Sequence, residues 1–254
     1  MRTLAIVLFS VGGSTVLGVL GGLLVRQIPH RLNDIVMGFA AGVMLAAAVL
    51  GLLGPAFGAQ GDIPLAVVGA VAGALLISAL DRIVPHLHRL AGLDTEEHRH
   101  NSSISRTLLF VSAIALHKIP EGLATGVSFG TGELGDILTV AGSISLQNVP
   151  EAVVIVAPLF AIGMSTGRTL LVSLGIALTS VVSVLCGYCL VSLFAGIMPL
   201  MLAAAGGAML YVISDEMIPE THSHGYEKPA TFALLAGLLL VLVLQTLLAD
   251  LGAA

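Results

Sequence analysis

Eight long apolar stretches run through the chain, and each approaches the roughly 20 residues that an α-helix needs to cross the hydrocarbon core of a bilayer. Only 10% of the 254 residues are charged, against about 25% in a typical soluble domain. The 30 glycines suit closely packed membrane helices. The sequence therefore predicts a single all-α integral membrane domain over residues 1–254, with helices at approximately 4–25, 34–54, 64–84, 106–128, 137–161, 169–192, 196–217 and 230–250.

Two short motifs have competing interpretations. The first apolar stretch follows a positive residue, as in a signal peptide, but no A-x-A-like cleavage site follows and the stretch continues to about Val25. We therefore expect a retained helix. Cys186 and Cys189 form C-G-Y-C, a spacing found in redox proteins. Because they lie inside an apolar stretch without a soluble βαβ unit, two thiols within a helix are the favoured interpretation.

The positive residues predict the orientation in the membrane. Eight of the ten Lys and Arg residues lie in or beside alternate connections: Arg26, Arg31, Arg82, Arg89, Arg99, Arg106, Arg168 and Lys228. The other connections contain none. By the positive-inside rule the positive side is cytoplasmic, and both termini lie outside.

Seven of the eight histidines fall on the same predicted cytoplasmic side: His30, His86, His88, His98, His100, His222 and His224. Four of them belong to a His-bearing loop at about 85–105. Metal capture near an exit and plain solvation of a polar loop are both compatible with this placement.

The eighth histidine, His117, begins the motif H-K-I-P-E inside an apolar stretch. Because helix 106–128 enters from the cytoplasmic side, a rise of 1.5 Å per residue places His117 and Glu121 near mid-membrane. Lys118, Glu121 and Glu151 would together cost roughly 8–10 kcal/mol if they were left unpaired in the bilayer. We therefore expect these charges to be paired, hydrated or bound to a ligand.

The spacing of the polar residues indicates a shared ligand. His117 and Glu121 are four residues apart and share a helix face, and Gln147 and Glu151 repeat this spacing in S-L-Q-N-V-P-E. The proline before each glutamate removes a helical hydrogen bond and loosens the helix. Two adjacent antiparallel helices would bring an imidazole, two carboxylates and an amide oxygen together, a ligand set that suits Zn²⁺, Fe²⁺ or Mn²⁺. The alternative is a polar packing network without a metal.

Further acidic and imidazole groups follow towards the cytoplasmic side, including a third motif, E-M-I-P-E, at 216–220. We interpret them as an exit pathway: Asp34, Asp81, Asp215, Glu216, Glu220, His222, His224, His86, His88, His98 and His100. For Glu216, solvation of a helix end is the competing interpretation. On the outer side an acidic rim would concentrate cations, and Asp250 is the candidate entrance residue.

Three motifs carry a resemblance to a known family. H-K-I-P-E-G-L-A-T-G-V-S-F-G, S-I-S-L-Q-N-V-P-E and G-G-A-M-L-Y-V-I-S-D-E-M-I-P-E-T-H resemble the Zrt/Irt-like (ZIP) divalent-metal transporters, most of all their prokaryotic GufA-like branch. The resemblance covers all eight stretches in number and order. It implies a 3+2+3 arrangement with inverted repeats, elevator-like alternating access, and uptake of Zn²⁺, Cd²⁺, Fe²⁺ or Mn²⁺ into the cytoplasm.

The resemblance also implies site residues. The primary metal ligands would be His117, Glu121, Gln147, Glu151 and Met44, although Met44 could equally be a core residue. Lys118 departs from the family's usual H-N-x-P-E, in which the asparagine helps to hold a second metal, and Asn148 stands where an aspartate is common. We predict a mononuclear site in which Lys118 substitutes for the charge of the second ion. A simple ion pair between Lys118 and Glu121 is compatible with this prediction.

The competing function is an intramembrane metal-dependent hydrolase. Such enzymes usually carry H-E-x-x-H and keep an open coordination position, and this chain lacks that motif. It also lacks the G-x-x-x-x-G-K-[ST] loop, which excludes ATP-driven pumping by this chain alone. We therefore expect a cell-membrane transporter that is not an enzyme, requires no cofactor and binds no nucleic acid. A monomer and a homodimer are both compatible with the sequence.

Overall fold

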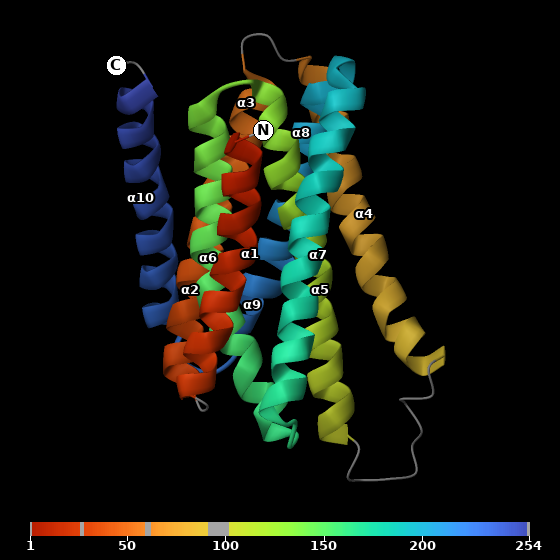
Figure 1. Ribbon diagram of the computed structural model, residues 1–254, viewed down its shortest axis with the longest axis vertical. Helices are drawn as coiled ribbons and strands as arrows, with labels where there is room; N and C mark the ends of the chain where they lie inside the picture. The colour runs from red at the N-terminus through yellow and green to blue at the C-terminus, as the bar shows by residue number, and fades with distance from the viewer. Residues whose placement is uncertain (1, 26–27, 59–61, 91–101, 253–254) are drawn as a thin grey trace.

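The computed structural model describes residues 2–25, 28–58, 62–90 and 102–252, and it describes their side chains except at 81–90, 102–114, 161, 195 and 248–252. Within these residues the secondary structure is entirely helical, and eight long rods stand side by side (Figure 1). The elements are α1 (Arg2–Val25), α2 (His30–Ala46) with η1 (Ala47–Leu53) and α3 (Gly54–Phe57), α4 (Ile63–Leu90), α5 (Ser102–Val127) with η2 (Ser128–Thr131), α6 (Leu134–Ala161), α7 (Thr166–Leu193), η3 (Ala195–Ile197), α8 (Met198–Val212) with η4 (Ile213–Met217) and α9 (Ile218–Thr221), and α10 (Glu227–Gly252).

Seven of these rods are long and apolar enough to cross a membrane, counted over the described residues. The remaining rod, α5, is also long but carries Lys118 and Glu121 in its second half. Large apolar side chains face outward, with Leu24 87% and Phe9 82% exposed, as expected where lipid is the solvent. The predicted all-α, multi-pass membrane fold is confirmed in this form.

The rods pack in pairs, α4 along α8, α2 along α10, α5 along α7 and α1 along α6. Glycine makes the closest approaches possible, because it has no Cβ. A Cβ added at Gly42 of α2 would lie 1.9 Å from the carbonyl oxygen of Leu234 in α10, and one at Gly18 of α1 would lie 2.3 Å from that of Val149 in α6. The second contact holds α1 against the part of α6 that bears the polar motif.

Two of the rods end in the same way. α2 and α8 each continue into a π-helical segment and then a short α-helix with proline in its first turn, Pro55 in α3 and Pro219 in α9. A π-helical segment adds a residue to the turn and is frequent at functional sites. In α8 this segment is η4, which contains Glu216.

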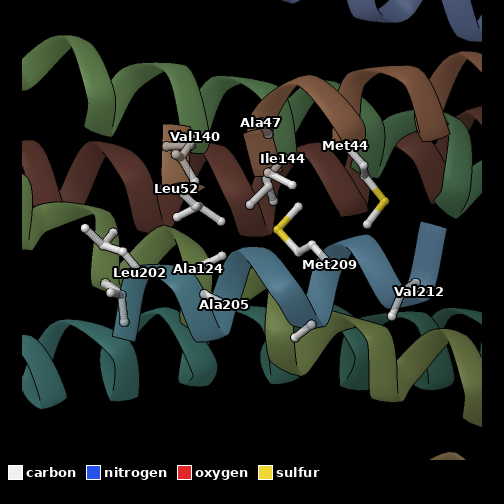
Figure 2. Packing of buried hydrophobic residues seen from close by; sticks show 14 of the residues in the cluster. Met44, Ala47, Leu52, Ala124, Val140, Ile144, Leu202, Ala205, Met209 and Val212 are labelled. Atoms are coloured by element: carbon white, nitrogen blue, oxygen red, sulfur yellow. The ribbon is translucent and has the colours of Figure 1, made fainter. Parts of the chain in front are cut away.

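A hydrophobic cluster fills the space between α2 with η1, α5, α6 and α8 (Figure 2). Its members Met44, Leu52, Ile144 and Met209 are at most 1% exposed. Along α6, Gln147 follows Ile144 by one turn. The cluster therefore lies beside the polar motif. Its members Leu52 and Leu202 lie towards the end of the molecule at which α2 ends and α8 begins (Figure 1), whereas Met37 and Met217 lie nearer the opposite end.

Candidate metal site

Lys118 of α5 is the centre of a buried polar group, and only 1% of the residue is exposed. Its Nζ donates to Oε2 of Glu121 at 2.6 Å, to Oδ1 of Asn148 at 2.7 Å, and also to Oε2 of Glu151. An ammonium has three N–H donors, so each donor has an acceptor. The two carboxylates are buried as well, and buried charges require such pairing and hydrogen bonding.

The amide of Asn148 is oriented by α1. Its Nδ2 donates to the carbonyl oxygen of Val11 at 3.2 Å and to Oγ of Ser14 at 3.4 Å. The amide oxygen is therefore left facing Lys118. The contribution of α1 was not part of the sequence prediction, because its small polar residues, among them Ser10, Ser14 and Thr15, form no motif in an otherwise apolar stretch.

Gln147 and Glu151 lie together on α6, as their spacing predicted. Nε2 of Gln147 donates to Oε1 of Glu151 at 3.4 Å, so both oxygens of this carboxylate accept hydrogen bonds. Oε1 of Gln147 is buried and has no hydrogen-bond partner. Leaving a buried acceptor without a donor costs free energy. A ligand that binds this oxygen would remove that cost.

His117 contacts a different carboxylate from the one that its spacing suggested. Its Nε2 lies 2.8 Å from Oε1 of Glu216, which joins α5 to η4. With this imidazole engaged and Lys118 between the two glutamates, the described side chains contain no group of three His, Cys, Asp or Glu residues placed to hold a metal ion.

A small cavity of about 30 Å³ adjoins these groups, and it is lined by Met37, His117, Glu121, Glu151, Val212 and Met217. A volume of this size holds about one water molecule or ion. Met37 and Met217 were not among the predicted site residues. Met44 lies in the hydrophobic cluster (Figure 2) and is not among the lining residues, so its role as a ligand stays a prediction.

Two of the predicted exit residues meet at the start of α2. Asp34 is fully buried, and its Oδ1 lies 3.1 Å from Nδ1 of His224. Its other oxygen has no hydrogen-bond partner. The ring of His30 stacks on that of His224 with centroids 4.8 Å apart. These contacts tie the segment after α9 to α2.

The other predicted exit residues are spread along the same end. Asp215 and Glu220 are exposed. Both ring nitrogens of His222 have local partners, the carbonyl oxygen of Ile218 at 2.8 Å and Oγ1 of Thr231 at 3.0 Å. Several predicted residues fall outside the described side chains: Asp81, His86 and His88 in α4, Asp250 in α10, and His98 and His100.

Comparison of the sequence with known proteins identifies the family. The ZIP zinc transporter family model matches residues 88–245. The chain belongs to the ZIP family. Among ZIP relatives, zinc transporter ZIPB from Bordetella bronchiseptica is 39% identical over 247 residues, which cover 92% of this chain and 78% of the relative. Zinc transporter GufA from Myxococcus xanthus is 41% identical over 179 residues, covering 70% and 68% of the two chains.

A more distant ZIP relative, zinc transporter ZupT from Chlorobium chlorochromatii, is 29% identical over 256 residues and matches 94% of each chain. These matches confirm the predicted family and its GufA-like branch. They also confirm that this ZIP protein is a transporter and not an enzyme, so the alternative of an intramembrane hydrolase is not favoured.

Proposed function

We propose that this ZIP protein carries zinc into the cytoplasm through a single-ion site between α5 and α6. The relatives named above are zinc transporters. The observation that carries the single-ion proposal is the position of the Lys118 ammonium, which spans Glu121 and Glu151. In that position it supplies a positive charge that would otherwise come from a second cation.

The primary ligands in this proposal are His117, Glu121, Gln147 and Glu151, with Met44 as a thioether ligand in part of the cycle. Three of these residues line the small cavity, and the unpartnered Oε1 of Gln147 is a further acceptor. The glutamates and Lys118 give the empty site a formal charge of −1, and one divalent ion changes it to +1. A fixed ammonium repels a second dication at short range.

The proposed direction of transport rests on the contrast between the two ends of the molecule. The part of the hydrophobic cluster around Leu52 and Leu202 closes the end that the positive-inside rule assigns to the outside. Glu216, Asp34 and His224 lie on the other side of the site. This arrangement supports an inward-facing state of a 3+2+3 fold with inverted repeats and both termini outside the plasma membrane. The wider exit pathway includes Asp215, Glu220 and His222, and Asp250 stays the proposed entrance residue.

Uptake by purified protein in liposomes tests the function. We expect zinc to accumulate with the unmodified protein and expect His117→Ala and Glu151→Ala to abolish accumulation, because each variant removes a primary ligand. Competition by Cd²⁺, Fe²⁺ and Mn²⁺ would define the range of transported ions. Hydrolysis of a peptide or lipid without ion flux would contradict the proposal.

The number of ions per chain is a separate measurement. Equilibrium dialysis against zinc, with zinc determined by mass spectrometry, should give one tightly bound ion in the α5–α6 site of the unmodified protein. Two tightly bound ions that both disappear in Glu151→Ala would refute the single-ion site and leave zinc transport standing.

A further inference from the structure

We infer that the thioethers of Met37 and Met217 form one wall of the ion site and set its preference for soft divalent cations. The inference rests on the proposed transport function. Met37 comes from α2 and Met217 from η4, and both line the small cavity together with His117, Glu121 and Glu151. Nothing in the motif spacing had assigned these two residues a role.

The cavity is so small that an ion bound in it would contact the sulfur atoms of its walls. A space of about 30 Å³ holds about one ion, so an ion held by the carboxylates also touches the remaining walls. Those walls are Val212, which has no donor atom, and the two methionines. Both methionines are buried, at 8% and 6% exposure. Their side chains therefore border the cavity directly.

Four of the six methionines on α2, α8 and η4 lie beside the ion site or in the cluster next to it. Met37 and Met44 are seven residues apart on α2, which keeps them on one helix face. Met209 and Met217 are eight residues apart, and the π-helical segment between them adds the extra residue. All four belong to the hydrophobic cluster, and Figure 2 labels Met44 and Met209 in it; of the four, only Met37 and Met217 line the cavity.

The chemistry of a thioether determines which ions gain from this wall. Thioether sulfur is a soft, neutral donor, whereas carboxylate and carbonyl oxygens suit harder ions such as Mn²⁺. The two methionines therefore leave the formal charge of the site unchanged and favour Cd²⁺, and to a lesser degree Zn²⁺, over Mn²⁺. They determine selectivity, while the carboxylates and the imidazole provide most of the binding.

X-ray absorption spectroscopy of bound Cd²⁺ tests the contact directly. Cys186 and Cys189 are exposed on α7 and would bind Cd²⁺ themselves, so the full chain is used with both changed to serine. One equivalent of Cd²⁺ should show cadmium–sulfur scattering that is lost in Met37→Leu/Met217→Leu. Leucine conserves the apolar volume, and either single variant should weaken the signal if the double variant does not fold.

Two further variants act as controls. Met201→Leu, on α8 in a separate apolar groove that also borders α4, should leave the sulfur signal unchanged. Met44→Leu tests the thioether expected from the family resemblance. The inference is overturned if no sulfur is seen, or if the signal depends on Met44 and not on Met37 or Met217.

Competitive uptake into liposomes gives the functional readout. The ratio of Cd²⁺ to Mn²⁺ uptake should fall roughly tenfold in Met37→Leu/Met217→Leu, within the 10–100-fold range seen when groups around a metal are altered, and stay constant in Met201→Leu. An unchanged ratio, with uptake still dependent on Glu151, would overturn this inference alone. Uptake that survives Glu151→Ala would instead remove the proposed function.

Discussion

The hydrophobic cluster and the polar group around Lys118 are neighbouring regions built partly by the same helices, yet they are held together in opposite ways. In the cluster, Leu52 and Ile144 are buried among apolar side chains. One turn along α6, the side chains are equally buried but charged or polar, and each N–H of the Lys118 ammonium has its own acceptor. The comparison shows that one part of a membrane helix can be stabilised by packing and the next by charge pairing.

Removing the charge of Lys118 should cause the largest loss of stability among the variants that separate the two regions. Lys118→Met keeps the apolar stem but leaves two buried carboxylates unpaired, which typically destabilises a protein by about 3–5 kcal/mol. We expect a clear loss of thermal stability in detergent with a chelator present. Added zinc should restore much of it, because a second cation then replaces the ammonium and ligand binding stabilises the folded state.

The control for this variant is Lys228→Met, which removes an exposed lysine in the first turn of α10. It should unfold at the temperature of the unmodified protein. If Lys118→Met were equally stable in chelator, the ammonium would not be what balances Glu121 and Glu151.

A cavity in the hydrophobic cluster should affect stability without affecting the ion site. Leu52 of η1 is fully buried, and truncation of such a leucine to alanine typically costs about 2–5 kcal/mol. Leu52→Ala should therefore lower the unfolding temperature, while dialysis should still find one bound zinc ion. Leu24→Ala, at an outward-facing position that is 87% exposed, should be close to neutral. A change in zinc stoichiometry in Leu52→Ala would show that the two regions are not separable.

The contact between His117 and Glu216 joins the polar group to η4 and should compete with the ion for the imidazole. A hydrogen bond to a charged group contributes about 1.5–3 kcal/mol, so Glu216→Gln should raise the affinity for zinc by roughly tenfold. Turnover should fall, because the ion loses its next acceptor. Titration calorimetry measures the affinity, and Glu220→Gln, at an exposed position in the next turn, should leave it unchanged. Weaker zinc binding in Glu216→Gln would instead identify Glu216 as a ligand of the bound ion.

The sequence predicted the helical stretches because long apolar stretches leave few other structures in a membrane. The ends were less predictable: the last helix begins at Glu227 instead of 230, since a helix continues through polar residues at the membrane surface. The motifs predicted that Lys118, Glu121 and Glu151 lie together. They did not predict the partner of His117 or the lining by Met37, since both depend on contacts between helices far apart in the sequence.

The contact between α1 and Asn148 is the clearest case of a contact that no sequence motif predicts. Removing part of it should have the smallest effect. Ser14→Ala removes one acceptor from Nδ2 of Asn148, while the carbonyl oxygen of Val11 remains, so the loss should be about 0.5–1.5 kcal/mol. The looser amide should hold the ammonium less firmly, and zinc affinity should change by a few-fold with expression unaltered. Ser10→Ala is the matched control, because Ser10 also contacts α6, through Ser145, but not Asn148. Equal zinc affinities in the two serine variants would mean that α1 supports the helix packing and not the position of Lys118.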